Sequence, residues 1–119
     1  MITALDHVQL AMPRGGEDQA RAFYVAVLGF TEIPKPSNLV TRGGLWLQSG
    51  TAHVHLGVEE DFRPAKKAHP ALLVDNLDEI RRTCEAAGSM LTIDEPLEGY
   101  DRAYVADPFG NRIELLQKL

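Results

Sequence analysis

The chain has 119 residues, of which 45% are hydrophobic and 24% charged, and 12 basic against 17 acidic side chains give a net charge of −5. This composition predicts one ordinary soluble domain that can bury a core of its own. The single cysteine, Cys84, excludes an internal disulfide, and no Cys-x-x-Cys pattern indicates a zinc ribbon. The acidic balance argues against nucleic-acid binding. Because no signal peptide and no apolar run of about 18 residues is found, we expect a cytoplasmic protein that does not contact a membrane.

The first half of the chain predicts the element order β-α-β-β-β. Alternating residues over Leu5–Leu10 indicate a strand. Apolar residues spaced by three and four from Ala20 to Leu28 indicate an amphipathic helix, which Gly29 would end in a left-handed conformation. The remaining elements of this half are an extended segment at 31–33, a loop at 35–42, and strands at 44–48 and 52–58.

The second half repeats this order after a polar connector at 59–67. Pro70 predicts an edge position or a local bulge for a strand at 68–74, because proline lacks a backbone donor. Asn76 and Glu79 form an N-cap signature for a helix over Leu77–Ala87, and Gly88 ends it. The other expected elements are an extended segment at 90–93, strands at 102–106 and 112–116, and a tight turn at 107–111. We therefore expect a single domain, 1–119, made of two modules at about 1–60 and 66–119.

Residues that can bind a metal fall at equivalent places in the two modules. His69 follows His7 by 62 residues, and Glu114 follows His55 by 59. Glu114 lies in an otherwise apolar strand, where a carboxylate is costly to bury unless it is paired or binds a metal, although an edge strand facing water explains it as well. Imidazole and carboxylate together suit Zn²⁺, Ni²⁺, Mn²⁺ or Fe²⁺. His53 has no counterpart in the second module, so we expect a half-buried imidazole hydrogen-bonded to backbone.

Three segments resemble the vicinal oxygen chelate superfamily, which contains glyoxalase I, fosfomycin-resistance proteins, extradiol dioxygenases and bleomycin-resistance proteins. They are the run Leu5–Val8, the helix end Ala22–Phe30 and the segment Ala106–Glu114, with its Asp-Pro-Phe-Gly-Asn turn. The resemblance covers almost the whole chain. It implies an α+β fold in which two βαβββ modules form an open, cupped, mixed sheet around a divalent metal ion.

The resemblance also implies which residues bind this ion and how chains assemble. By position, the metal ligands are His7, His55, His69 and Glu114. Glyoxalase I usually has glutamate where this chain has His55, and the serine- and lysine-bearing loop of fosfomycin-resistance proteins is not recognisable in Asp94–Tyr100. In glyoxalase I and fosfomycin-resistance proteins two chains usually complete each site, which implies a homodimer that acts on a small molecule. The alternative is a single chain that closes the cup on itself.

The function implied first is a metal-dependent, glyoxalase-like lyase or isomerase that acts on a small oxygenated or electrophilic metabolite. The metal would chelate two neighbouring substrate oxygens, with Glu114 as a ligand and possible catalytic base. The residues expected to contact substrate are Gln9, Trp46, Gln48, Arg102 and Tyr104, although sheet packing explains the two aromatic residues as well. The alternatives are an Fe(II) extradiol-type dioxygenase and a non-catalytic drug- or metabolite-binding resistance protein.

Overall fold

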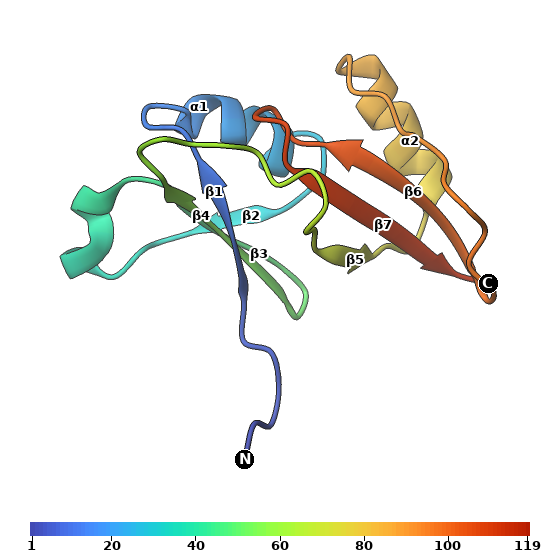
Figure 1. Ribbon diagram of the computed structural model, residues 1–119, viewed down its shortest axis with the longest axis horizontal. Coiled ribbons are helices and arrows are strands. Elements are labelled where there is room, and N and C mark those ends of the chain that lie inside the picture. Colours follow the sequence, from blue (N-terminus) through green and yellow to red (C-terminus); the bar gives the residue numbers. More distant parts are fainter.

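The computed structural model describes all 119 residues, and Figure 1 shows two groups of strands side by side. The first half of the chain contains β1 (Val8–Met12), α1 (Glu17–Ala20), the π-helical turn η1 (Arg21–Val25), β2 (Thr31–Ile33), the 3₁₀ helix η2 (Ser37–Arg42), β3 (Leu45–Ser49) and β4 (Ala52–Val58). The second half contains β5 (Ala71–Leu73), α2 (Leu77–Ala86), β6 (Tyr100–Ala106) and β7 (Arg112–Lys118). This order confirms the α+β class, and the second half repeats the first with one strand fewer.

Each half builds its own mixed sheet. The first sheet has the strand order β1-β4-β3-β2 and the second β5-β7-β6. In each sheet the first strand of the half runs parallel to the last one, β1 beside β4 and β5 beside β7, while β3 and β6 pair antiparallel with those last strands. The strand carrying His55 and the strand carrying Glu114 therefore occupy equivalent inner positions.

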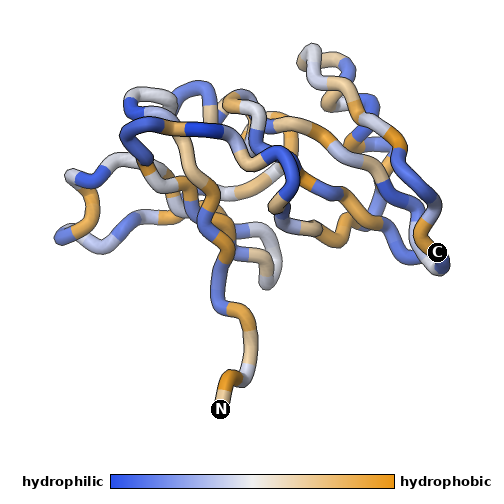
Figure 2. Tube along the Cα trace, viewed as in Figure 1, coloured by the Kyte–Doolittle hydropathy of each residue, from blue (hydrophilic) through white to orange (hydrophobic).

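One face of each sheet packs against the helices. The side chains on this face are apolar and buried, among them Leu47, Leu56, Ile113 and Leu115, and they join Phe23 of η1 in one hydrophobic core. In Figure 1 both helices lie along the upper side of the molecule, and the N-terminal segment leaves from the lower side. Figure 2 shows apolar and polar residues alternating along the strands, as expected for sheets that are buried on one face only.

The turn between β6 and β7 is fixed by its own side chains. Oδ1 of Asp107 accepts hydrogen bonds from the backbone N–H groups of Phe109 and Asn111, at 2.9 and 2.8 Å. The Asn111 amide donates to the carbonyl of Ala11 in β1, at 2.8 Å. The Asp-Pro-Phe-Gly-Asn motif therefore orders the turn and connects the second half of the chain to the first.

The helices form largely where the sequence predicts them. Oδ1 of Asn76 accepts a hydrogen bond from the N–H of Glu79 at 3.0 Å, and Gly29 and Gly88 both have positive φ angles just beyond a helix, which confirms the predicted caps. The first helix differs within its span. From Arg21 onward it is π-helical, and this wider turn accommodates two consecutive buried aromatic residues, Phe23 and Tyr24.

Several predicted strands are shorter than expected. Residues 90–93 form only an isolated bridge from Thr92 to Tyr104, so the second sheet has three strands. Met90 and Ile93 are exposed, so this segment buries little apolar surface. β1 and β5 begin at Val8 and Ala71, so His7 and His69 lie just before their strands. β5 is an edge strand, as Pro70 predicts. No helix combines the length and the apolar character needed to cross a bilayer.

Candidate functional site

The predicted site residues of the strands lie on the faces directed away from the helices. In the first sheet the partners of His55 across the two neighbouring strands are Gln9 and Trp46. In the second sheet the equivalent partners of Glu114 are Ala71 and Tyr104. Because paired residues of adjacent strands project to the same side, each sheet gathers its own candidate residues on its open face.

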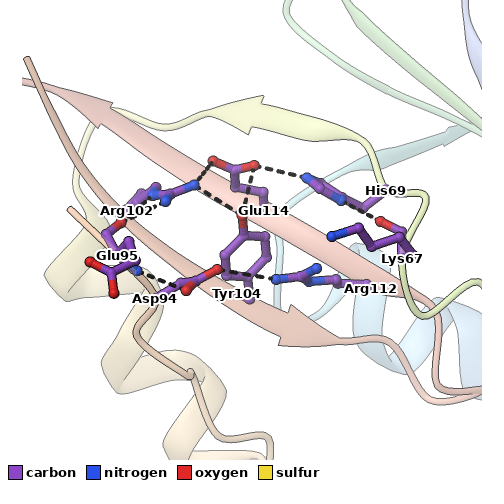
Figure 3. Close-up of polar contacts among 8 residues, drawn as sticks. All are labelled: Lys67, His69, Asp94, Glu95, Arg102, Tyr104, Arg112 and Glu114. Carbon is purple, nitrogen blue, oxygen red and sulfur yellow. Dashed lines mark hydrogen bonds and ion pairs between the residues drawn. The ribbon is translucent and has the colours of Figure 1, made fainter. Parts of the chain in front are cut away.

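Glu114 is the centre of a polar cluster on the second sheet, drawn in Figure 3. Its Oε1 lies 2.9 Å from Nε2 of His69 and 3.3 Å from the hydroxyl of Tyr104. Its Oε2 lies 3.3 Å from the guanidinium of Arg102, which also donates to the Tyr104 hydroxyl at 3.0 Å and to the backbone carbonyl of Glu95. Glu114 is buried, with 6% of its surface exposed, and all its neighbours in this cluster are hydrogen-bond donors.

These donors keep the Glu114 carboxyl group ionised. Burial by itself would raise the pKa of Glu114, but the hydrogen bonds from His69 and Arg102 outweigh it and leave the pKa below its ordinary value. Nδ1 of His69 lies 2.8 Å from the carbonyl oxygen of Lys67, which can only accept, so Nδ1 carries a proton. The hydrogen bond from Nε2 to Glu114 therefore needs a second proton on the ring, and removal of that proton would free the Nε2 lone pair for a metal ion.

Three aromatic rings are stacked on the open face of the first sheet. The ring of His55 lies between that of Trp46, at a centroid distance of 4.1 Å and an angle of 7°, and that of His7, at 4.0 Å and 18°. This explains how His55 is only 7% exposed although it points away from the core. Burial, aided by the neighbouring His7 and His53, lowers the pKa of His55, so its imidazole is neutral at neutral pH.

His7 is more accessible and is oriented by an acid. Its Nδ1 lies 2.9 Å from Oδ1 of the exposed Asp6, which leaves Nε2 without a partner. His7 and His69, the two histidines that precede the first strands of the modules, thus share one feature: Nδ1 is held by an oxygen acceptor and Nε2 points elsewhere. Such outer contacts fix the ring tautomer of metal-binding histidines.

The four predicted metal ligands come together as two pairs within one chain. His7 and His55 form one pair and His69 and Glu114 the other, and nowhere does the chain hold three or more His, Cys, Asp or Glu side chains in a group suited to a metal ion. The His7 and His55 rings are also stacked at an angle of 18°, so their nitrogen lone pairs, which lie in the ring planes, do not meet at one point in this arrangement. Each sheet therefore presents half of the predicted ligand set.

Pockets lie over both open faces. One of about 590 Å³ is on the first sheet and is lined by Gln9, Trp46 and His55 together with residues of the segment Ile33–Gly43. A second, of about 390 Å³, is on the second sheet and includes Tyr104 and Arg112. The side chain of Gln9 lies across Gly57, where a Cβ atom would come within 2.5 Å of its Nε2, so glycine at 57 makes room for it.

The sequence and the fold were compared with known proteins. The family model described as the glyoxalase/bleomycin resistance protein/dioxygenase superfamily matches residues 4–115. The chain belongs to this superfamily. A structure from Bacillus anthracis, described as of the glyoxalase family, is 45% identical over 100% of this chain and 98% of its own, with a TM-score of 0.95. No curated protein matches the chain.

More distant structures share the superfamily fold. The fosfomycin resistance protein FosX of Listeria monocytogenes is 18% identical, with a TM-score of 0.74 and coverage of 100% of this chain and 94% of that one. A virulence protein of Salmonella typhimurium is 20% identical, also with a TM-score of 0.74, over 100% and 99%. At these identities the likeness concerns the fold alone.

The chemistry of the donor set in this superfamily member fits a divalent metal ion. Neutral His55 and ionised Glu114 have the protonation states that metal ligation requires, and His7 and His69, each held through Nδ1, would bind a metal ion through an unprotonated Nε2. The set also mixes nitrogen and oxygen ligands, which suits transition metals, whereas calcium prefers oxygen ligands only. What one chain lacks is convergence of the two pairs on one point.

The five predicted substrate residues have different surroundings. Gln9 and Trp46 line the larger pocket. Tyr104 lines the smaller one, and Arg102 is engaged with Glu114 and the Glu95 carbonyl rather than free to hold a substrate carboxylate. The Gln48 amide donates to the carbonyl of Gly50 in the adjoining turn, at 3.2 Å.

The sequence interpretation missed some residues of the larger pocket. Lys35 and Arg42 belong to a segment that was predicted only as a loop, yet both line this pocket. His53, expected to bond to backbone, has no hydrogen-bond partner in the chain and lines the same pocket. These three residues come together through tertiary packing. In the sequence, the only signal is that two basic residues, Lys35 and Arg42, precede the strand that carries Trp46.

Arg112 lies on the other sheet. It pairs with the acid Asp94, at 3.5 Å, and lies over the Tyr104 ring.

Proposed function

We propose that this chain is a metal-dependent, glyoxalase-like lyase or isomerase whose sites are each shared between two copies of the chain. The observation that carries the proposal is the division of ligand-capable residues into two pairs, His7 with His55 and His69 with Glu114, one on each open sheet face. Proteins of this superfamily are often dimers that act on small molecules. A second copy that lays its second sheet over the first sheet of its partner would complete the ligand set.

In such a site His7 and His55 of one copy, with their rings turned out of the stacked arrangement, and the equivalents of His69 and Glu114 from the other would hold Zn²⁺, Ni²⁺, Mn²⁺ or Fe²⁺. When bound, the ion supplies Lewis-acid polarisation of two adjacent substrate oxygens. Glu114 is also suited to take a proton from a substrate carbon and return it, since it is ionised and lies at the centre of its cluster. Tyr104 donates to Oε1 of Glu114 and thereby fixes the direction of the carboxylate.

The direct test is metal analysis of tag-free protein purified without chelator. We expect about one divalent ion per chain, because two copies form two sites. His69→Ala and Glu114→Gln are each expected to lose most of this metal. His53→Ala is the matched control, a histidine of the same open face outside the proposed ligand set, and it should keep the metal. Wild-type protein without affinity for any of the four metals would contradict the proposal.

One observation favours a second candidate, a protein that binds a drug or metabolite without transforming it. Both carboxylate oxygens of Glu114 already have partners within the chain, and the larger pocket lies over the other sheet. In that case the variant with alanine at His7, His69 and Glu114 would keep its affinity for the ligand. The dioxygenase alternative is tested in parallel: oxygen consumption with ferrous iron and catechol would support it over a lyase or isomerase.

A further inference from the structure

The pocket of about 590 Å³ on the first sheet has an unbalanced charge. Two permanently basic side chains, Lys35 and Arg42, line it, and Asp6 is the only acid among its lining residues. Asp6 is already engaged with His7. The three histidines of the lining, His7, His53 and His55, add hydrogen-bonding capacity but no further acid.

Arg42 differs from most arginines of the chain in having no acidic partner. Five others form ion pairs with acids of the chain; these are Arg14, Arg21, Arg81, Arg102 and Arg112. Arg42 forms neither an ion pair nor a side-chain hydrogen bond and stands at the end of η2, at the rim of the pocket. Its planar donor fork is therefore available, and this geometry matches carboxylates and phosphorus oxyanions.

Lys35 is held close to the same place. Its Nζ donates to the carbonyl of Gly43, the residue that follows Arg42 and also lines the pocket. Glu17, whose carboxylate interacts electrostatically with Lys35, accepts a hydrogen bond from the backbone N–H of Gly44 at 2.9 Å. The Lys35 ammonium is therefore held beside the backbone next to Arg42, and both side chains keep donors for a ligand.

Part of the remaining pocket wall is apolar or aromatic. Ile33, Leu39 and Val58 contribute aliphatic surface. Trp46, the ring at one end of the stack that contains His55, contributes aromatic surface. A ligand filling this space would have an anionic end at Lys35 and Arg42 and an apolar body against Trp46. The volume suits a compact organic molecule, because ligand pockets usually measure about 300–1,000 Å³.

We propose that the substrate of this site is a small organic oxyanion, a carboxylate or a phosphorus oxyanion, held by Arg42 and Lys35 with its apolar body along Trp46 and Leu39. The orientation that this gives the reacting oxygens, toward His7 and His55, rests on the proposed function. Recognition of the anion by Arg42 and Lys35 does not need the metal. Arg42 and Lys35 are thus specificity residues, contributed by the segment between β2 and β3.

Trp46 is the only tryptophan of the chain, so its fluorescence reports on this pocket directly. The experiment titrates the full-length protein, in excess chelator, with benzoate, phenylphosphonate and the neutral analogue benzamide. We expect at least one of the anions to change the Trp46 emission with saturation, and benzamide to bind at least about tenfold more weakly. Whichever anion binds more tightly identifies the oxyanion as a carboxylate or a phosphorus acid.

Arg42→Gln should weaken anion binding by about tenfold or more, and Lys35→Gln by several fold, with little change for benzamide. Arg63→Gln is the matched control, an exposed arginine in the connector outside the pocket lining, and it should bind like wild type. The proposal would be overturned if benzoate and benzamide bound equally, or if no anion bound at all. It would also be overturned if Arg42→Gln and Lys35→Gln both still preferred the anions to benzamide as strongly as wild type does.

Metal content of the same variants separates this inference from the proposed function. Arg42→Gln should keep its metal if both ideas hold. Anion binding that depends on Arg42 in a protein that takes up no metal would remove the proposed function and leave the oxyanion subsite standing. Full metal binding in a protein whose anion affinity does not depend on Arg42 or Lys35 would remove the oxyanion subsite and leave the proposed function standing.

Discussion

The hydroxyl of Tyr24 donates a hydrogen bond of 2.6 Å to Oδ2 of Asp107, which lies 83 residues later in the chain. Tyr24 is fully buried and Asp107 is 5% exposed. Burial, together with the adjacent Asp107 carboxylate, raises the pKa of Tyr24 far above its ordinary value, so the hydroxyl remains a donor at every pH where the protein is folded. This bond joins the helix of the first half to the turn that leads into β7, the strand of Glu114.

Tyr24→Phe removes this donor and leaves a buried carboxylate oxygen with one partner fewer. We expect the free energy of unfolding to fall by about 2 kcal/mol, since hydrogen bonds to charged groups contribute about 1.5–3 kcal/mol. Urea denaturation measures the change. Tyr100→Phe is the control, because the Tyr100 hydroxyl has no hydrogen-bond partner, and it should alter stability by less than about 0.5 kcal/mol. Equal effects of the two substitutions would show that the Tyr24 bond adds no stability.

Gly44 is required by its surroundings as well as by its backbone. Its φ is +82°, and a Cβ atom there would lie 2.0 Å from the carbonyl oxygen of Leu56. Gly50 also has a positive φ, +56°, but nothing lies within 4 Å of its Cβ position. Gly50→Ala should therefore cost about 1–2 kcal/mol of conformational strain, and Gly44→Ala at least about 2 kcal/mol more from the clash. Similar denaturation midpoints for the two variants would contradict this.

Glu17 makes stability depend on pH at the rim of the larger pocket. The hydrogen bond from the Gly44 N–H lowers the pKa of Glu17 below its ordinary value of 4.5. Ionised Glu17 therefore stabilises the folded protein. This stabilisation is fully present above pH 4.5, the ordinary pKa, and is lost as the pH falls through the lower pKa that Glu17 has in the folded state. We expect Glu17→Gln to lose less stability than wild type between neutral pH and about pH 3, as measured by urea denaturation. Parallel loss in the two proteins would place the acid sensitivity elsewhere.

A shared site predicts recovery of metal binding between two defective chains. In a dimer of one His7→Ala chain and one His69→Ala chain, one site lacks both histidines and the other is intact. After unfolding and refolding the two variants together, about a quarter of the wild-type metal should return, because half of randomly formed dimers are mixed. Each variant refolded alone is the control. No recovery in the mixture would indicate that each chain binds metal by itself.

Arg102 should compete with a metal ion for Glu114. Its guanidinium takes up Oε2 and places a positive charge 3.3 Å from it. If the proposed ligand set is correct, Arg102→Gln should tighten metal binding by roughly fivefold, because the competing positive charge is removed. Competition with a chelating dye measures the affinity. Arg14→Gln, which removes an exposed ion pair with Glu60, serves as the control and should change nothing. Weaker binding in Arg102→Gln would mean that Arg102 instead orients the carboxylate for the metal.

Local sequence patterns predicted those features that depend on neighbouring residues. The Asn76 cap follows from spacing alone, and the structure has it where expected. Strand alternation likewise separates His55 and Glu114 from their apolar neighbours. The π-helical turn at Arg21–Val25 was not predicted, because apolar spacing does not distinguish it from an α-helical turn. Contacts between distant segments were also missed. The engagement of Arg102 with the Glu95 carbonyl, and of Lys35 and Arg42 with the larger pocket, depends on loops whose course no periodicity reveals.

Because side chains alternate between the two faces of a strand, a ligand-capable residue and its apolar neighbours can be substituted independently. Val54 and Leu56 belong to the buried core, while His55 between them faces the opposite side. The same holds for Glu114 between Ile113 and Leu115. A substitution at His55 or Glu114 changes the open face without opening a cavity among the apolar side chains. Descendants of such a chain can exchange, add or discard ligands one sheet at a time while the protein continues to fold.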